Sequence, residues 1–224
     1  MEEFFKDIIP FSTQVMGAGA LLVARFTSLF SVVNPLTAIP VFLSLTDGNS
    51  EKETARTARK ASIYMFCVLI TFLLIGTFIL SFFGISLSGI RIAGGIIIMR
   101  AGFYMMNPEK TGRKLSKEDQ EAAKDKEDIS FSPLAMPLLS GPGSIAVVIG
   151  FGSQATSIVD YVVTGVAVLL TAFLAWAILR VAPWLNKLIG KTGMTVIPRL
   201  MGFIALSIGV QFIINGIAKF FGIG

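Results

Sequence analysis

The sequence contains no histidine and only one cysteine, and both absences exclude classes of site. A single cysteine, Cys67, forms no disulfide within the chain and cannot build a zinc site from several thiolates. Because Cys67 falls within an apolar run, we expect it to be a small buried hydrophobic residue. Without histidine, the chain also lacks the side chain that most often transfers protons near neutral pH.

Charge is scarce as well, at 15% of residues, and none of the fourteen carboxylates lies inside an apolar run. The proton relays of membrane pumps usually contain such groups, so ion coupling here would depend on carbonyls, hydroxyls and amides, which suit Na⁺ better than H⁺. There is no phosphate-binding glycine loop, and no nucleophile is paired with a base. We therefore expect no enzymatic activity and no cofactor, with Na⁺ as the candidate coupling ion.

Hydrophobic residues dominate instead, at 54% of the chain with a mean hydropathy of +0.76. A bilayer is the natural solvent for such a composition. A helix needs about 20 apolar residues to cross the hydrocarbon. Six stretches meet that length, at residues 11–45, 61–83, 85–106, 130–159, 161–183 and 197–221. The sequence thus predicts an all-α polytopic membrane protein with six transmembrane helices.

Residues 107–129 form the single linker-like segment, crowded with charges of both signs. They divide the chain into a first unit at 1–106 and a second at 130–224. Lysine and arginine gather in the first, third and fifth connections, which the positive-inside rule assigns to the cytoplasm. Both termini are then outside the cytoplasm, in a multi-pass protein of the inner (plasma) membrane. This rule also explains the basic pI near 9.5, so no nucleic-acid partner is expected.

The two units resemble each other at a nearly constant offset. Pro35 and Pro142 are 107 residues apart within similar segments, and Arg91 and Arg199 are 108 residues apart. Each unit holds three spans, and an odd number makes the second copy enter the membrane upside down. The sequence thus predicts two inverted three-helix repeats, an architecture of many secondary transporters.

Proline interrupts the first and fourth spans. Asn34 followed by Pro35 is a typical helix start, since asparagine caps free N–H groups and proline suits the first helical position. In the fourth span Gly141, Pro142 and Gly143 follow Ser140, with Ser140 or Gly141 as the cap. We therefore predict that both helices are broken, each into two halves.

The breaks predict a binding site. Thr37 and Ser144 each stand two residues after their proline, in the first turn of a second half-helix. In an inverted repeat these N-termini would converge near the middle of the membrane and attract a carboxylate, while the preceding carbonyls would suit an ammonium group or Na⁺. Such a site is complementary to a zwitterion. The alternative is that both prolines only kink continuous helices. The predicted binding residues are Asn34, Pro35, Thr37, Ser140, Gly141, Gly143 and Ser144.

Further polar residues lie inside the spans. Ser207, Gln211 and Asn215 form one stripe on the last span and either line a route or join helices. Arg91 and Arg199 are expected to be snorkelling anchors, or gates at the two mouths of the pathway. Repeat symmetry places Arg25 near the outer interface.

Four further sets of residues form recognisable motifs: Val33-Asn34-Pro35 to Thr46, Phe83 to Leu87 with Arg91 to Gly95, Pro133 to Gly143, and Arg199 to Gly202. In these motifs the chain resembles the MarC family of integral membrane proteins, also known as UPF0056 and related to Snat-type neutral amino-acid transporters, and the resemblance covers nearly the whole chain. The resemblance implies a six-span plasma-membrane protein, with small neutral amino acids such as glycine or alanine as substrates of some relatives.

Together these features predict a secondary transporter for a small zwitterion that works by alternating access around the two breaks. The alternatives are an exporter or channel for another small solute, and a membrane factor that does not transport. Whether copies of the chain form a homo-oligomer is left open by the sequence.

Overall fold

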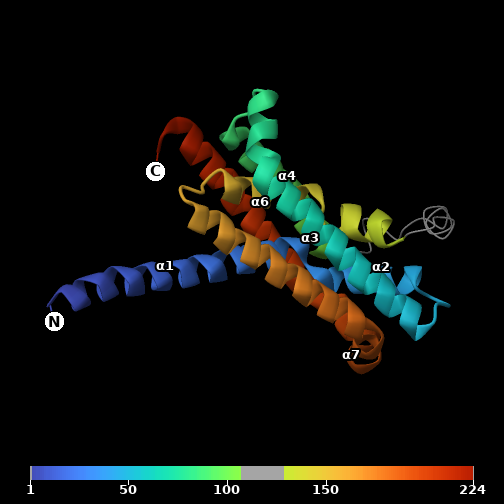
Figure 1. Ribbon diagram of the computed structural model, residues 1–224. Coiled ribbons are helices and arrows are strands. Elements are labelled where there is room, and N and C mark those ends of the chain that lie inside the picture. The colour runs from blue at the N-terminus through green and yellow to red at the C-terminus, as the bar shows by residue number, and fades with distance from the viewer. Residues whose placement is uncertain (1, 107–128, 224) are drawn as a thin grey trace.

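The computed structural model describes residues 2–106 and 129–223, and every regular element within them is helical (Figure 1). The predicted all-α class is confirmed. The linker predicted at 107–129 lies outside the described residues except for its last one, so the division into two units stays a prediction. The elements are α1 (Glu2–Val33), α2 (Pro35–Leu45), α3 (Glu51–Phe82), α4 (Leu87–Met106), η1 (Ser130–Leu139), α6 (Pro142–Gly152) and α7 (Ile158–Phe221).

Five helical stretches of the described chain are long and apolar enough to cross a membrane. The first combines α1 and α2, and α7 supplies the last two. The predicted fourth span is instead split between η1 and α6, and α6 has only 11 residues. A sixth crossing therefore remains a prediction. The five stretches are Gly17–Leu45, Glu51–Phe82, Leu87–Met106, Ile158–Leu185 and Arg199–Phe221.

Capping boxes fix the starts of two long helices. At α3, the Glu53 N–H donates to Ser50 Oγ at 3.3 Å, and the Ser50 N–H donates to Glu53 Oε2 at 2.8 Å. Ser157 and Asp160 make the same reciprocal pair at the start of α7. Each box satisfies N–H groups that a helix start leaves unpaired. The loops before both helices are thereby held to a single geometry.

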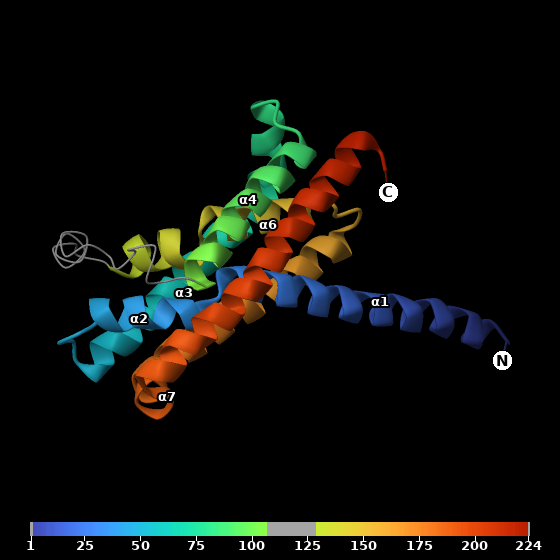
Figure 2. The same ribbon diagram turned by 180° about the vertical axis from the view of Figure 1, so that it is seen from behind.

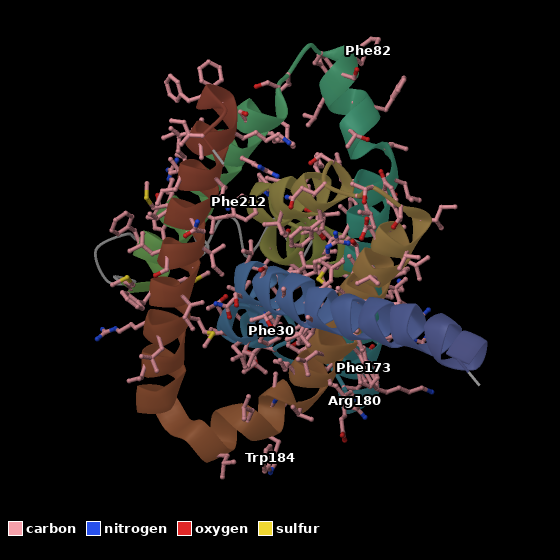
Figure 3. The ribbon with its side chains drawn as sticks, turned by 90° about the vertical axis from the view of Figure 1, so that its left-hand side faces the viewer. Phe30, Phe82, Phe173, Arg180, Trp184 and Phe212 are labelled. Atoms are coloured by element: carbon pink, nitrogen blue, oxygen red, sulfur yellow. The ribbon has the colours of Figure 1, made fainter. Side chains whose placement is uncertain are left out.

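Helix α7 is one element of 64 residues, but it does not run straight. Figure 3 shows two arms joined by a short transverse stretch near Trp184. Pro183 lies directly before this tryptophan and Pro198 directly before the second arm, and a proline inside a helix removes one hydrogen bond and bends the axis. The arms correspond to the predicted spans 161–183 and 197–221.

Segment η1 is irregular because it contains two prolines. Ser132 and Met136 have extended backbones, with φ/ψ of −127°/121° and −130°/123°. Each precedes a proline, whose ring disfavours the helical conformation for the residue before it. Phe131 nevertheless anchors the segment on α3, where its ring lies 5.6 Å from that of Tyr64.

Glycines allow α4 and the second arm of α7 to pack backbone against backbone (Figure 2). A Cβ atom on Gly95 would lie 2.6 Å from the Gly209 carbonyl oxygen, and one on Gly102 would lie 2.7 Å from the Gly202 oxygen. As the residue number rises on α4 it falls on α7, so the two helices are antiparallel. We call these four glycines the glycine seam. Small residues at such crossings let membrane helices approach closely.

The core lies where α1, α2, α3, α6 and the first arm of α7 meet, around side chains such as Leu29, Phe42, Met65, Leu69 and Val147. Large apolar side chains also cover much of the outside, as a lipid-facing surface requires. Cys67 belongs to this outer surface of α3, so the expectation that it is buried was wrong. Its position on an apolar helix did not reveal which face of the helix it occupies.

Candidate functional site

The first predicted break is confirmed, because α1 ends at Val33 and α2 begins at Pro35. Asn34 joins them with φ 43° and ψ 67°, and it is the one described residue other than glycine with a positive φ. Asparagine tolerates this left-handed conformation better than most residues. Pro35 has no N–H for the carbonyl four residues earlier, so the helical ladder is interrupted here.

Asn34 is 1% exposed, yet its side chain is only partly satisfied. The amide nitrogen lies 3.7 Å from Met105 Sδ, a weak acceptor. The amide oxygen is buried and has no hydrogen-bond partner among the described residues. A buried polar atom without a partner is costly, and such atoms are rare in native structures. The Asn34 oxygen is therefore a candidate ligand for a bound donor.

The second predicted break is confirmed at Ser140 and Gly141, between η1 and α6. Ser140 has φ −103° and ψ 53°, and Gly141 is extended with φ −69° and ψ 170°. Ser140 is fully buried, and both its N–H and its hydroxyl donate to the Ala135 carbonyl, at 2.7 and 2.9 Å. These bonds hold the end of η1, while α6 starts at Pro142 without a side-chain cap.

Thr37 and Ser144 occupy equivalent places after the two breaks. Thr37 Oγ1 donates to the Asn34 carbonyl at 2.8 Å, and Ser144 Oγ donates to the Gly141 carbonyl at 2.9 Å. Ser144 Oγ also lies 3.3 Å from the Leu139 carbonyl oxygen. Both hydroxyl protons are thus committed to the main chain, and the lone pairs of the hydroxyls remain for a ligand. Shaping the break is a role that sequence reasoning did not assign to them.

The two breaks lie side by side. A Cβ atom on Gly143, in the first turn of α6, would lie 3.5 Å from Val32 Cγ1 in the last turn of α1. It would also lie 2.9 Å from Ile98 Cγ1 of α4. Moreover, α1 packs against α6 and α2 packs against η1, so the halves of one broken segment contact those of the other. Glycine at position 143 is what permits this approach.

The electrostatics of this region follow from the helix ends. The start of α6 carries unpaired N–H groups and a partial positive charge, while the end of α1 carries carbonyls and a partial negative charge. No cluster of three histidine, cysteine, aspartate or glutamate side chains occurs in the part of the chain that the structure describes. The region can therefore offer dipoles, an amide and hydroxyls to a ligand.

The two arginines predicted to be anchors or gates lie on α4 and on the second arm of α7. Arg91 is half-buried on α4 next to Gly216, whose Cβ would lie 3.2 Å from Arg91 Cβ. Arg199 is exposed at the start of the second arm of α7. Because α4 and this arm are antiparallel, the two arginines lie toward opposite ends of the pair. Their roles as anchors or gates stay predictions.

The polar stripe Ser207, Gln211 and Asn215 is exposed on the second arm of α7. In contrast Phe212, on the same arm, points toward α6, where a Cβ on Gly150 would lie 4.0 Å from its ring (Figure 3). Within one copy of the chain, the stripe thus faces away from the broken helices. Its role in lining a route stays a prediction.

Sequence reasoning missed a buried cation contact at the start of α7. Arg25 is 6% exposed, and its Nη1 donates to the Asp160 carbonyl at 2.5 Å and to Thr164 Oγ1. Its guanidinium also lies 5.6 Å from the centroid of the Phe151 ring. A lone arginine in an apolar run was the available signal, but its partners are about 135 residues away in the sequence.

The comparisons with known proteins agree with the membrane fold. The family described as "MarC family integral membrane protein" matches residues 19–221. A UPF0056 membrane protein of Buchnera aphidicola is 37% identical over 203 residues, which cover 90% of this chain and 94% of that protein. A UPF0056 membrane protein of Methanocaldococcus jannaschii is 38% identical over 195 residues, which cover 87% and 95%.

A bacterial relative carries a more specific name. The UPF0056 inner membrane protein MarC of Escherichia coli is 38% identical over 205 residues, which cover 85% of this chain and 91% of that protein. No solved structure matches the chain. The names of these relatives give a location in the membrane but no substrate. The extent of the match and the five apolar helices show that this chain is an integral membrane protein of the MarC family.

Proposed function

We propose that this protein is a secondary transporter of small neutral amino acids, zwitterions of the size of glycine or alanine, across the inner membrane. One observation carries the proposal: two interrupted segments meet, and the buried Asn34 at one interruption has an unpartnered amide oxygen. Discontinuous helices of this kind form the substrate sites of many secondary transporters.

Charge complementarity supports a zwitterion. The N–H groups in the first turn of α6 suit a carboxylate, as anions bind at helix N-termini. The Asn34 oxygen and the carbonyls that end α1 suit an ammonium group. Val32 and Ile98 approach Gly143 closely, so a substrate bound beside Gly143 would have to be small. Glycine and alanine meet this requirement, and they are the substrate class that the resemblance to Snat-type transporters implies.

The proposal includes two inverted three-helix repeats with six crossings and both termini outside the cytoplasm. The glycine seam supports the repeat. An offset of 107 maps Gly95 onto Gly202 and Gly102 onto Gly209, and Gly95 contacts Gly209 while Gly102 contacts Gly202. Such reciprocal pairing is typical of elements related by a two-fold axis. The matching hydrogen bonds of Thr37 and Ser144 follow the same offset.

In the proposed cycle, rocking of the two repeats opens the shared site to one side of the membrane and then to the other. The gradient of Na⁺ drives the transport, with backbone carbonyls at the breaks as its oxygen ligands. The protein acts without a cofactor and without catalysis. An exporter or channel for another solute, and a membrane factor that does not transport, are the competing functions.

Counterflow in proteoliposomes tests the proposal. Vesicles loaded with unlabelled alanine should accumulate external labelled alanine transiently, and a Na⁺ gradient should raise net flux over a K⁺ gradient. A channel would give flux that does not saturate and no counterflow. Absence of saturable exchange with glycine, alanine and the other small neutral amino acids would contradict the substrate assignment.

A further inference from the structure

The second arm of α7 presents two opposite faces. Gly202, Gly209 and Gly216 are buried against α4. A helix turns about 100° per residue, so Gln211 lies about 200° around the axis from Gly209. Gln211 and Asn215 therefore point away from the rest of the chain, and both are exposed.

The surroundings of this stripe are apolar. Phe203, Ile204, Val210 and Ile214 are all exposed on the same arm, and they border the polar side chains. A water-filled route would have polar neighbours on both sides, whereas these neighbours are suited to lipid. An amide that faced lipid alone would leave donors and acceptors unsatisfied, which the hydrocarbon penalises. A protein surface with matching polar groups is the occupant that this face requires.

The amides of the stripe are complementary to themselves. Gln211 Nε2 donates to Asn215 Oδ1 at 2.9 Å. This bond leaves the Gln211 oxygen as an acceptor and the Asn215 nitrogen as a donor, and neither has a partner in the described parts of the chain. A copy of the same pair, rotated by two-fold symmetry, supplies one donor and one acceptor in return.

We propose that the Ser207, Gln211 and Asn215 stripe is the interface to a second copy of this chain, so that the protein is a dimer in the membrane. Two copies inserted in the same orientation are related by an axis along the membrane normal. Their second α7 arms then cross in parallel, which brings residues 211 and 215 of one copy near 211 and 215 of the other. Interhelical hydrogen bonds between such amides are a common means of association in membranes.

A second copy fits this face better than the other apolar surfaces of the chain. The outer side of α3 carries Leu74, Phe78 and Phe82, and the first arm of α7 carries Leu169 and Phe173, all exposed and apolar. These large apolar side chains suit lipid, and none of them offers an amide to a second copy. The inference does not depend on transport, because it uses only the orientation and hydrogen bonds of the stripe.

Cysteine cross-linking tests the interface, and the single native cysteine makes the background simple. In a Cys67→Ser chain, Ser207→Cys retains both amides and places a thiol beside them. Phe173→Cys, on the first arm of α7, is the matched exposed control. Oxidation in native membranes should give disulfide dimers with Ser207→Cys at several times the yield obtained with Phe173→Cys.

A second variant distinguishes a specific interface between two copies from random collision of copies in the membrane. Gln211→Leu with Asn215→Leu, added to the Ser207→Cys chain, should reduce the dimer yield at least fivefold, while size-exclusion elution shows that the variant remains folded. Equal yields from Ser207→Cys and Phe173→Cys, or an unchanged yield after the two leucine substitutions, would overturn the proposal. Rapid labelling of Ser207→Cys by a membrane-impermeant thiol reagent would also overturn it, since that result means a water-lined face.

Discussion

Gly95 on α4 and Gly209 on α7 approach each other reciprocally. A Cβ atom on Gly95 would lie 2.6 Å from the Gly209 carbonyl oxygen, and one on Gly209 would lie 2.7 Å from the Gly95 oxygen. The nearest atom at each position is a backbone oxygen, so the two backbones would have to separate to accommodate a methyl group. The glycine seam therefore sets the distance between the two helices that flank the broken segments.

Substitution within the seam should destabilise the fold. We expect Gly209→Ala to lower the free energy of unfolding by about 1–3 kcal/mol, the usual cost of overpacking a tight contact. Gly165→Ala, in the first arm of α7, is the matched control because its Cβ would meet only Ile70 Cδ1, at 4.0 Å. Thermal unfolding in detergent compares them, and equal melting temperatures for both variants would show that the seam is not tight.

Because Asn34 has a left-handed backbone, a substitution can remove its side-chain amide while the backbone conformation is retained. Glycine adopts φ 43° freely, so Asn34→Gly should keep the break and the melting temperature while the buried oxygen is lost. A hydrogen bond to a charged group contributes about 1.5–3 kcal/mol, so the Kd for alanine should rise at least about tenfold. Equilibrium binding to purified protein measures this change.

Asn34→Ala is the companion variant. Alanine lacks the amide and also disfavours the left-handed conformation by roughly 1–2 kcal/mol, so this variant should lose stability as well as affinity. If Asn34→Gly binds alanine as tightly as the wild type, the amide oxygen is not a ligand.

The Arg25 contact should be important for stability. Arg25→Met keeps much of the apolar stem but removes the hydrogen bonds to Asp160 and Thr164. Loss of hydrogen bonds from a buried charged donor should destabilise the fold by about 1.5–3 kcal/mol. Arg56→Met on α3 is the control, because Arg56 is exposed. Chemical unfolding of both variants measures this difference. An equally small decrease in the free energy of unfolding of each variant would mean that the buried contact contributes little to stability.

The sequence predicted the breaks well because their causes are local. A proline lacks an N–H wherever it stands, and Asn34 before Pro35 carries its own conformational preference, so position and type of interruption followed from neighbouring residues. The same reasoning applied to Gly141 and Pro142. The extended backbones at Ser132 and Met136 also have local causes, because each precedes a proline, but no irregularity was predicted there.

What depends on distant partners could not be predicted. A stripe with a period of four fixes one face of a helix, yet nothing in residues 199–221 tells which neighbour that face meets. The sequence therefore leaves open whether Gln211 and Asn215 line a route or join helices. Likewise the partners of Arg25 are about 135 residues away. Even the seven-residue spacing of Gly202 and Gly209 indicates a close crossing only once Gly95 and Gly102 are seen opposite them.

A substrate site where the two breaks meet is tested by equilibrium binding of labelled alanine to purified Gly143→Ala protein, with Gly150→Ala as the control on the same helix. A Cβ at 143 would lie where the two breaks meet, 2.9 Å from Ile98 Cγ1, whereas one at 150 would meet only Phe212, at 4.0 Å. The account predicts saturable binding by the wild type and by Gly150→Ala, and an affinity at least about tenfold weaker for Gly143→Ala. No saturable binding by the wild type, or equal affinity in all three proteins, would contradict it.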